Sequence, residues 1–165
     1  MTLIAHTWAY MKREKALKYL KLAFYQANLF SKDPNTKVAA IILSNDTHSV
    51  LSTGYNGIPR GMDDNNPVRW ERPTKYLWVS HAELNALCSA ARHGTAVENG
   101  IAVVTMFPCC DCAKALIQSG IKTIISIKPD LESPKWGEHF RISMDMFQEV
   151  GVQVFLFNQE DVVWN

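Results

Sequence analysis

The chain has 165 residues, of which 47% are hydrophobic and 20% are charged, and its formal net charge is +1. This length and composition are those of one globular domain with a core of its own. A charge so close to zero argues against a large contact with duplex nucleic acid, which needs a basic face, but it is compatible with a small anionic ligand. The sequence contains no apolar run long enough to span a membrane.

The N-terminal segment MTLIAHTWAYMKREK indicates how the four cysteines should be interpreted. It lacks the basic start, the apolar centre and the small-residue cleavage site of a secretory signal, so we expect a cytoplasmic protein. Thiols stay reduced in that compartment. Metal ligation or core packing is therefore favoured over disulfide bonds.

Hydrophobic spacing predicts the first elements in chain order. A helix is expected over residues 8–30, and the SKDPNT turn ends it. Val38–Leu43 and Val50–Tyr55 are predicted to form two strands of a hairpin. The segment Gly54–Pro73, rich in Gly, Pro, Asn and Asp, is predicted to be a long loop. Long loops inside compact domains are usually functional.

The second half of the chain alternates between strands and helices. The strands are expected at Ile101–Thr105, 122–127 and 152–157, and the helices near Ala82–Arg92, Cys109–Gln118 and Glu138–Val150. This alternation predicts a three-layer α/β/α sandwich with a mixed five-stranded sheet, in which pairing is parallel after the initial hairpin. No repeat or linker divides the chain, so residues 1–165 are expected to form a single domain.

One histidine and two cysteines have the spacing of metal ligands. His81 opens one predicted helix, while Cys109 and Cys112 lie three residues apart at the start of another and share one face of it. A helix N-terminus lowers the pKa of a thiol and favours the thiolate that binds metals. Helix N-termini follow the carboxyl ends of strands, where open α/β sheets bind ligands, so we expect the three side chains to converge.

Three protein ligands leave the fourth position of a tetrahedral zinc ion open to water, whose pKa then falls to about 7. Glu83 can reach that water as a base without binding the metal. The pattern H-x-E…P-C-x-x-C resembles that of the zinc-dependent nucleobase deaminases. The alternative is a structural zinc with Cys110 or Cys88 as a fourth ligand. However, Cys110 lies about 100° around the helix from Cys109, and Cys88 fits an apolar helix face.

Five segments extend this resemblance over most of the chain: SKDPNTKVAAII, GYNGIPRGMDD, TKYLWVSHAELNAL, FPCCDCAKALIQSGIK and MFQEVGVQVF. They are similar to the deoxycytidylate (dCMP) deaminases of the cytidine deaminase superfamily, and the combination of SKDPNT, GYNG and HAELNA is what selects this branch. The resemblance implies zinc-dependent hydrolytic deamination of dCMP to dUMP with release of ammonia, which supplies dUMP for thymidylate synthesis.

The resemblance also implies the site residues. One zinc ion per subunit would be held by His81, Cys109 and Cys112, while Glu83 would carry protons between the water, N3 of the base and the leaving ammonia. The implied contacts to the deoxyribose, the pyrimidine edge and the ring face are Asn35, the backbone of Ala82 and Val38, respectively.

The 5′-phosphate of dCMP needs a cation, and the resemblance favours Arg92. A family member uses an arginine at the same offset, nine residues after Glu83. A solvated charge at the C-terminal end of a helix explains Arg92 nearly as well. Arg60 and Lys114 are weaker candidates.

The segment Gly54, Tyr55, Asn56 and Gly57 resembles part of an allosteric site. In many dCMP deaminases this site binds dCTP, which activates, and dTTP, which inhibits, and Mg²⁺ could accompany the triphosphate. Glycine allows the backbone to approach phosphates closely, and the alternative is that these glycines only shape a turn. Such enzymes are commonly homo-oligomers, with hexamers favoured.

Other interpretations stay open at this stage. Ala39 stands where the family often has glycine, which leaves the acceptance of C5-modified dCMP open. A deaminase of the same fold could act on cytidine or guanine instead. A zinc-stabilised nucleotide sensor without turnover would have no use for Glu83. The near-neutral charge argues against a nucleic-acid editor, so neither a nucleic acid nor a membrane is an expected partner.

Overall fold

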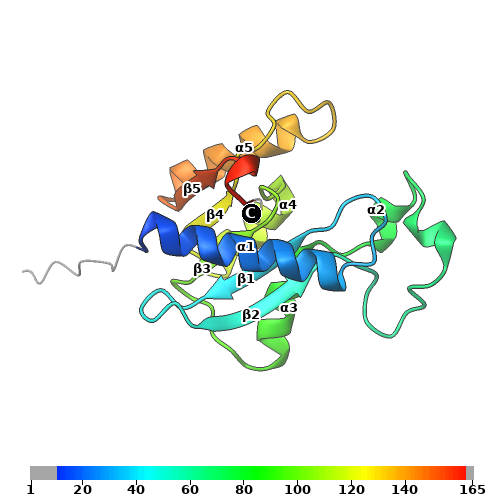
Figure 1. Ribbon diagram of the computed structural model, residues 1–165, viewed down its shortest axis with the longest axis horizontal. Coiled ribbons are helices and arrows are strands. Elements are labelled where there is room, and N and C mark those ends of the chain that lie inside the picture. Colours follow the sequence, from blue (N-terminus) through cyan, green and yellow to red (C-terminus); the bar gives the residue numbers. More distant parts are fainter. Residues whose placement is uncertain (1–10, 163–165) are drawn as a thin grey trace, which may run out of the picture.

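A five-stranded mixed sheet forms the centre of the molecule, as seen in the computed structural model, which describes residues 11–162 (Figure 1). The strands, in the spatial order β2-β1-β3-β4-β5, are β1 Ala39–Leu43, β2 Val50–Tyr55, β3 Ile101–Val104, β4 Thr123–Ile127 and β5 Gln153–Phe157. The α-helices are α1 Arg13–Phe30, α2 Lys75–Trp78, α3 Ala82–Arg92, α4 Cys110–Gln118 and α5 Gly137–Glu149, and the 3-10 helices are η1 Pro67–Trp70 and η2 Gln159–Val162.

The strand pairing confirms the mixed sheet and corrects one predicted pair. β1 and β2 form the expected antiparallel hairpin, and β3, β4 and β5 pair in parallel. β1 and β3, however, pair antiparallel, with Ala40 opposite Val104. The reason is that α3 carries the chain from β2 across β1. β2 and β3 therefore run in the same direction on either side of β1, and both are antiparallel to β1.

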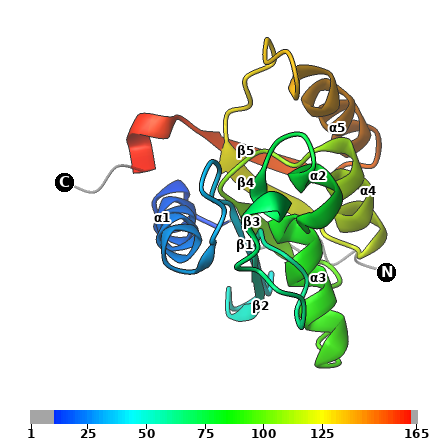
Figure 2. The ribbon, with the colours of Figure 1, turned by 90° about the vertical axis from the view of Figure 1, so that its right-hand side faces the viewer.

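Side chains alternate between the two faces of the sheet, and each face has its own core. Ile41 and Leu43 of β1 pack with α1 and η2. Ala40 and Ile42 of the same strand pack with α3, α4 and α5. Figure 2 shows α1 on one side of the sheet and these three helices on the other. The predicted three-layer α/β/α sandwich is therefore confirmed.

Most element boundaries lie within one residue of prediction, and the larger departures are at two places. The first helix begins at Arg13, while residues 8–10 of the predicted helix lie outside the described residues. The predicted long loop contains η1 and leads into α2, two elements of a single turn each. η1 begins at Pro67, after Asn66, whose side chain accepts a hydrogen bond from the Val68 N–H at 3.1 Å. Among the described residues, no helix has the length and apolar character needed to cross a membrane.

Candidate functional site

The starts of two helices meet beside the carboxyl end of β3. His81 is the N-cap residue of α3, and Cys109 is the N-cap residue of α4. Cys112 follows as the third residue of α4. Both helices therefore direct their free N–H groups, which carry partial positive charge, toward the same place.

These three side chains form a compact cluster, as the sequence predicts. Nδ1 of His81 lies 3.5 Å from Sγ of Cys109 and 3.4 Å from Sγ of Cys112. The three candidate ligand atoms lie within 4.8 Å of one another. A tetrahedral zinc ion with Zn–S about 2.3 Å and Zn–N about 2.0 Å places nitrogen and sulfur ligands about 3.5 Å apart. The cluster therefore fits Zn²⁺ in both chemistry and size, and it supplies three ligands, which leaves a fourth position open.

The pKa values of the two buried thiols shift in opposite directions because the thiols interact. A hydrogen bond from Cys112 lowers the pKa of Cys109 to about 4 against the opposing effect of burial, and His81 adds to the lowering. The pKa of Cys112 is raised by its hydrogen bond to Cys109 and by burial. One thiolate is therefore favoured from the outset, and a divalent cation would displace the remaining proton.

The carboxyl group of Glu83 lies beside the cluster, in the first turn of α3. Glu83 is 4% exposed, and this burial raises the pKa of its carboxyl group to about 7, because a hydrogen bond from its own backbone N–H and the charge of His81 only partly offset the loss of solvent. A carboxyl group with a pKa near neutrality can both accept and donate a proton, as a general acid–base catalyst requires.

The cluster and Glu83 open into a pocket whose lining combines apolar walls with a few polar groups, as small-molecule sites usually do. Its lining residues are Asp33, Thr36, Val38, Asn56, Arg72, Lys75, Tyr76, Val79, His81, Ala82, Glu83, Met106, Phe107, Cys109, Trp136 and Phe140.

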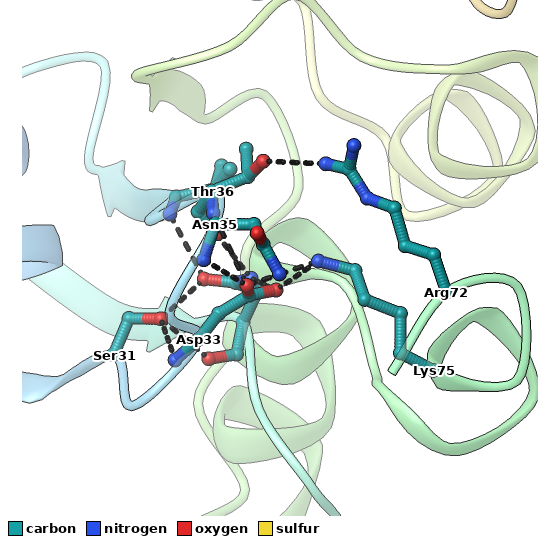
Figure 3. Close-up of polar contacts among 8 residues, drawn as sticks. Ser31, Asp33, Asn35, Thr36, Arg72 and Lys75 are labelled. Atoms are coloured by element: carbon teal, nitrogen blue, oxygen red, sulfur yellow. Dashed lines mark hydrogen bonds and ion pairs between the residues drawn. The ribbon is translucent and has the colours of Figure 1, made fainter. Parts of the chain in front are cut away.

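Three of the predicted substrate contacts have distinct positions. Val38 and Ala82 line the pocket. Asn35 is exposed and faces a separate depression beside Pro34 and Trp70. Figure 3 shows the turn that carries Asn35 next to the pocket wall. The deoxyribose contact assigned to Asn35 stays a prediction.

The predicted phosphate ligand lies away from the pocket. Arg92 is the last residue of α3, nine positions beyond Glu83, which corresponds to about 14 Å along a helix axis. It does not line the pocket, and neither do Arg60 and Lys114. Lys114 instead pairs with Asp111 on the exposed face of α4, with Nζ and Oδ1 2.7 Å apart.

The segment predicted to bind effectors, Gly54–Gly57, makes close packing and backbone contacts within the domain. Gly54 lies so close to α3 that a Cβ atom there would overlap the backbone of Ala82 and Ala86. The ring of Tyr55 stacks on that of Phe30, with centroids 5.7 Å apart. Gly57 forms a backbone bridge to Ser80 through hydrogen bonds of 3.1 and 2.9 Å.

Asn56, from the same segment, is buried and lines the pocket beside the metal-ligand cluster. Its Oδ1 accepts hydrogen bonds from the Val38 N–H at 2.9 Å and from the Ser31 hydroxyl at 2.7 Å. Its Nδ2 donates to Asp33 and to the Thr36 carbonyl oxygen. All four hydrogen bonds connect the β2 end with the turn after α1, so Asn56 holds this wall of the pocket in place.

The other two cysteines are separated from the cluster. Sγ of Cys110 lies 3.0 Å from Nδ1 of His139, and Cys88 is exposed on α3. Neither belongs to the set of three metal-ligand candidates found among the described residues.

Sequence reasoning missed most of the pocket wall that faces the cluster. Asp33 and Lys75 form a buried ion pair in which Nζ lies 2.6 and 2.9 Å from the two carboxylate oxygens (Figure 3). Trp136 reaches the pocket from the segment before α5, with its ring centroid 6.2 Å from that of His81. Composition offered a signal for this wall. The segment before α3 is rich in arginine, lysine and aromatic residues, which is unusual for a connection that is only solvated.

A three-layer α/β/α fold with a His/Cys/Cys cluster and a buried glutamate at two helix starts defines a zinc-dependent deaminase domain. The family model described as "Cytidine and deoxycytidylate deaminase zinc-binding region" matches residues 13–128. The chain therefore belongs to the cytidine and deoxycytidylate deaminase family, in its deoxycytidylate deaminase branch.

The individual relatives support this assignment at moderate identity. The "Uncharacterized deaminase in luxG 3'region" of Aliivibrio fischeri is 38% identical over 141 residues, which cover 83% of this chain and 92% of that protein. The deoxycytidylate deaminase of Pongo abelii is 37% identical over 134 residues, which cover 78% of this chain and 72% of that protein. The crystal structure of the dCMP deaminase from the cyanophage S-TIM5 in complex with dCMP and dUMP matches with a TM-score of 0.71 and 28% identity, covering 90% of this chain and 100% of that one.

Proposed function

We propose that this protein, as a single deaminase domain, hydrolyses dCMP to dUMP with release of ammonia. The observation that carries the proposal is Glu83, a buried carboxyl group beside the His81–Cys109–Cys112 cluster at the floor of a pocket. The deoxycytidylate deaminases among the relatives, and the solved dCMP deaminase with dCMP and dUMP, support dCMP as the substrate.

In this proposal His81, Cys109 and Cys112 hold one zinc ion. When bound, the ion acts as a Lewis acid that activates water at neutral pH. Glu83 accepts a proton from that water. It gives a proton to N3 of the cytosine and later carries one to the nitrogen that leaves from C4. Its pKa, raised by burial to about 7, suits both directions of transfer.

The pocket walls position the base against this floor. The backbone of Ala82 faces the pyrimidine edge, and Val38 contacts the ring face, while Phe107, Trp136 and Phe140 limit the access of water. The rings of Phe107 and Phe140 pack edge to face with centroids 5.9 Å apart, so this wall is part of the folded core. Asn35 contacts the deoxyribose in the same scheme.

The finer parts of the proposal concern regulation and assembly. They comprise activation by dCTP, inhibition by dTTP, Mg²⁺ bound with the triphosphate, a homo-hexamer, a cytoplasmic location and a role in dUMP supply. The resemblance of the Gly54–Gly57 segment to regulated dCMP deaminases supports the effectors, the resemblance of the whole chain supports the assembly and the role in dUMP supply, and the N-terminal segment supports the location. An effector that favours the active state must bind more tightly when a substrate analogue is present, with a coupling of roughly 1–3 kcal/mol.

The test is a substrate panel on the zinc-loaded protein. Ammonia release is measured with dCMP, deoxycytidine, cytidine and guanine, and dUMP is identified by chromatography. We expect dCMP to have the highest kcat/KM, and the same assay with dCTP and dTTP measures regulation. Turnover of cytidine or guanine in the absence of turnover of dCMP would assign the site to another base.

A further inference from the structure

A nucleotide substrate needs a cation to receive its phosphate, and the pocket offers few. Among the described residues that line it, the only lysine and arginine side chains are Lys75 and Arg72. Both come from the segment between β2 and α3, in which Lys75 begins α2, and this segment contributes to the wall of the pocket. The question is which of these two charges is available to an anion.

Lys75 is already neutralised. Its side chain is 4% exposed, and its Nζ contacts both carboxylate oxygens of Asp33, itself 1% exposed. Burial would raise the pKa of Asp33, but hydrogen bonds from Lys75 and from the N–H groups of Asn35 and Thr36 together lower it. Asp33 therefore stays ionised at neutral pH, and the pair presents no net charge to the pocket.

Arg72 differs from Lys75 in both its exposure and its charge pairing. It is exposed, and no ion pair joins it to an acidic group within residues 11–162. One terminal nitrogen donates to Oγ1 of Thr36 at 3.4 Å, a distance longer than that of a strong hydrogen bond. An arginine has five N–H donors, so its planar fork is still available to an anion.

The surroundings of Arg72 favour a phosphate at this place. Figure 3 shows Arg72 and Lys75 extending side by side from the same segment, with Lys75 fixed on Asp33 and Arg72 directed at Thr36. The ion pair anchors the backbone three residues from Arg72 and so fixes where its side chain begins. Thr36 lines the pocket, and its hydroxyl can donate to an anion while it accepts from Arg72.

The nucleotide's own shape decides which end reaches Arg72. The amino group of the base must lie at the metal-ligand cluster, and the 5′-phosphate lies at the other end of the molecule. We propose that Arg72, together with the hydroxyl of Thr36, binds the 5′-phosphate and makes the enzyme select a nucleoside monophosphate over the nucleoside. This inference rests on the proposed function and replaces Arg92 as the expected phosphate ligand.

The experiment compares substrates with and without the phosphate. In the zinc-loaded full chain, kcat/KM is measured with dCMP and with deoxycytidine for wild type, Arg72→Ala, Arg72→Gln, Arg92→Ala and Arg60→Ala. Hydrogen bonds to charged groups are the strong ones, so both Arg72 variants should lose roughly ten- to a hundredfold with dCMP and less than about twofold with deoxycytidine. Arg72→Gln keeps a polar side chain of similar reach, so a folding defect of the alanine variant would not remove the test.

Binding provides the second readout and does not depend on turnover. Calorimetry with dUMP, dCMP and deoxyuridine should show that Arg72→Ala weakens the two monophosphates and leaves deoxyuridine unchanged. If the wild type binds monophosphates through Arg72 but does not deaminate dCMP, the proposed function fails while the phosphate assignment stands. Equal losses for both substrates, a dCMP-selective loss in Arg92→Ala or Arg60→Ala alone, or no monophosphate binding by the wild type would each overturn the assignment.

Discussion

The floor and the facing wall of the pocket are built in different ways. The floor consists of His81, Glu83, Cys109 and Cys112, which come from two short motifs at the starts of α3 and α4. The wall depends on the buried pair of Asp33 and Lys75, which are 42 positions apart in the chain. The floor is thus specified by local spacing, and the wall by tertiary contacts.

This difference separates chemistry from positioning. Other side chains pack α3 and α4 against the sheet. Replacing a floor residue should therefore change metal binding or turnover and leave the fold largely intact. The wall residues hold a loop against the domain, so replacing them should change stability or affinity. The following substitutions test this separation, from the largest expected effect to the smallest.

Cys112→Ser should remove zinc from the floor and abolish activity, because a hydroxyl is a far poorer zinc ligand than a thiolate and the cluster found within residues 11–162 has three candidate ligands. Cys110→Ser is the matched control two positions away, since Sγ of Cys110 is directed at His139. It should retain about one zinc per chain. Metal analysis by mass spectrometry measures both. Equal zinc loss in the two variants would show that Cys110 is a ligand.

Glu83→Gln should leave zinc content and folding nearly unchanged and reduce kcat by roughly 10²- to 10⁴-fold, the usual contribution of a general acid–base group. Glutamine has almost the same shape but cannot carry the proton. Loss of zinc in this variant would contradict the assignment, because it would mean that Glu83 holds the metal.

Lys75→Ala tests the wall. It leaves the Asp33 carboxylate buried without its partner, which should reduce the free energy of unfolding by about 3–5 kcal/mol. Lys32→Ala is the control, because Lys32 and Asp64 join the same two segments through an exposed pair at 2.8 Å. That pair should contribute about 0–1 kcal/mol. Urea unfolding measures both, and equal effects would mean that burial of the Lys75 pair contributes nothing.

The same contrast explains how far sequence reasoning reached. The bounds of β2 and α3 were predicted as observed, because alternating and helical hydrophobic patterns report directly on burial. The metal-ligand cluster was predicted because helix geometry fixes the relation of Cys109 to Cys112, and the strand before each helix fixes where it starts. Such local relations are carried by the sequence itself.

The facing wall could not be predicted in the same way. Nothing in the spacing of Lys75 and Asp33 indicates that they meet, and Arg72 resembles any loop arginine until the partner of Lys75 is known. Arg92 was favoured because it lies nine residues after Glu83, but it is the last residue of α3 and does not line the pocket. The antiparallel pairing of β1 with β3 likewise follows from the path of α3 over the sheet and not from either strand.

The two glycines at the end of β2 give the finest test, because both belong to the proposed effector segment. Gly54→Ala should destabilise the fold by about 1–3 kcal/mol, since the new methyl group would meet the backbone of α3, which cannot move aside as a side chain could. Gly57→Ala should change stability by less than about 0.5 kcal/mol, because nothing lies within 4 Å of its Cβ position.

Measuring dCTP and dTTP responses on these same variants separates the two interpretations of the segment. A normal fold with a lost response in Gly57→Ala supports effector binding. A full response in Gly57→Ala, with a loss of stability confined to Gly54→Ala, would assign the glycines to strand–helix packing alone.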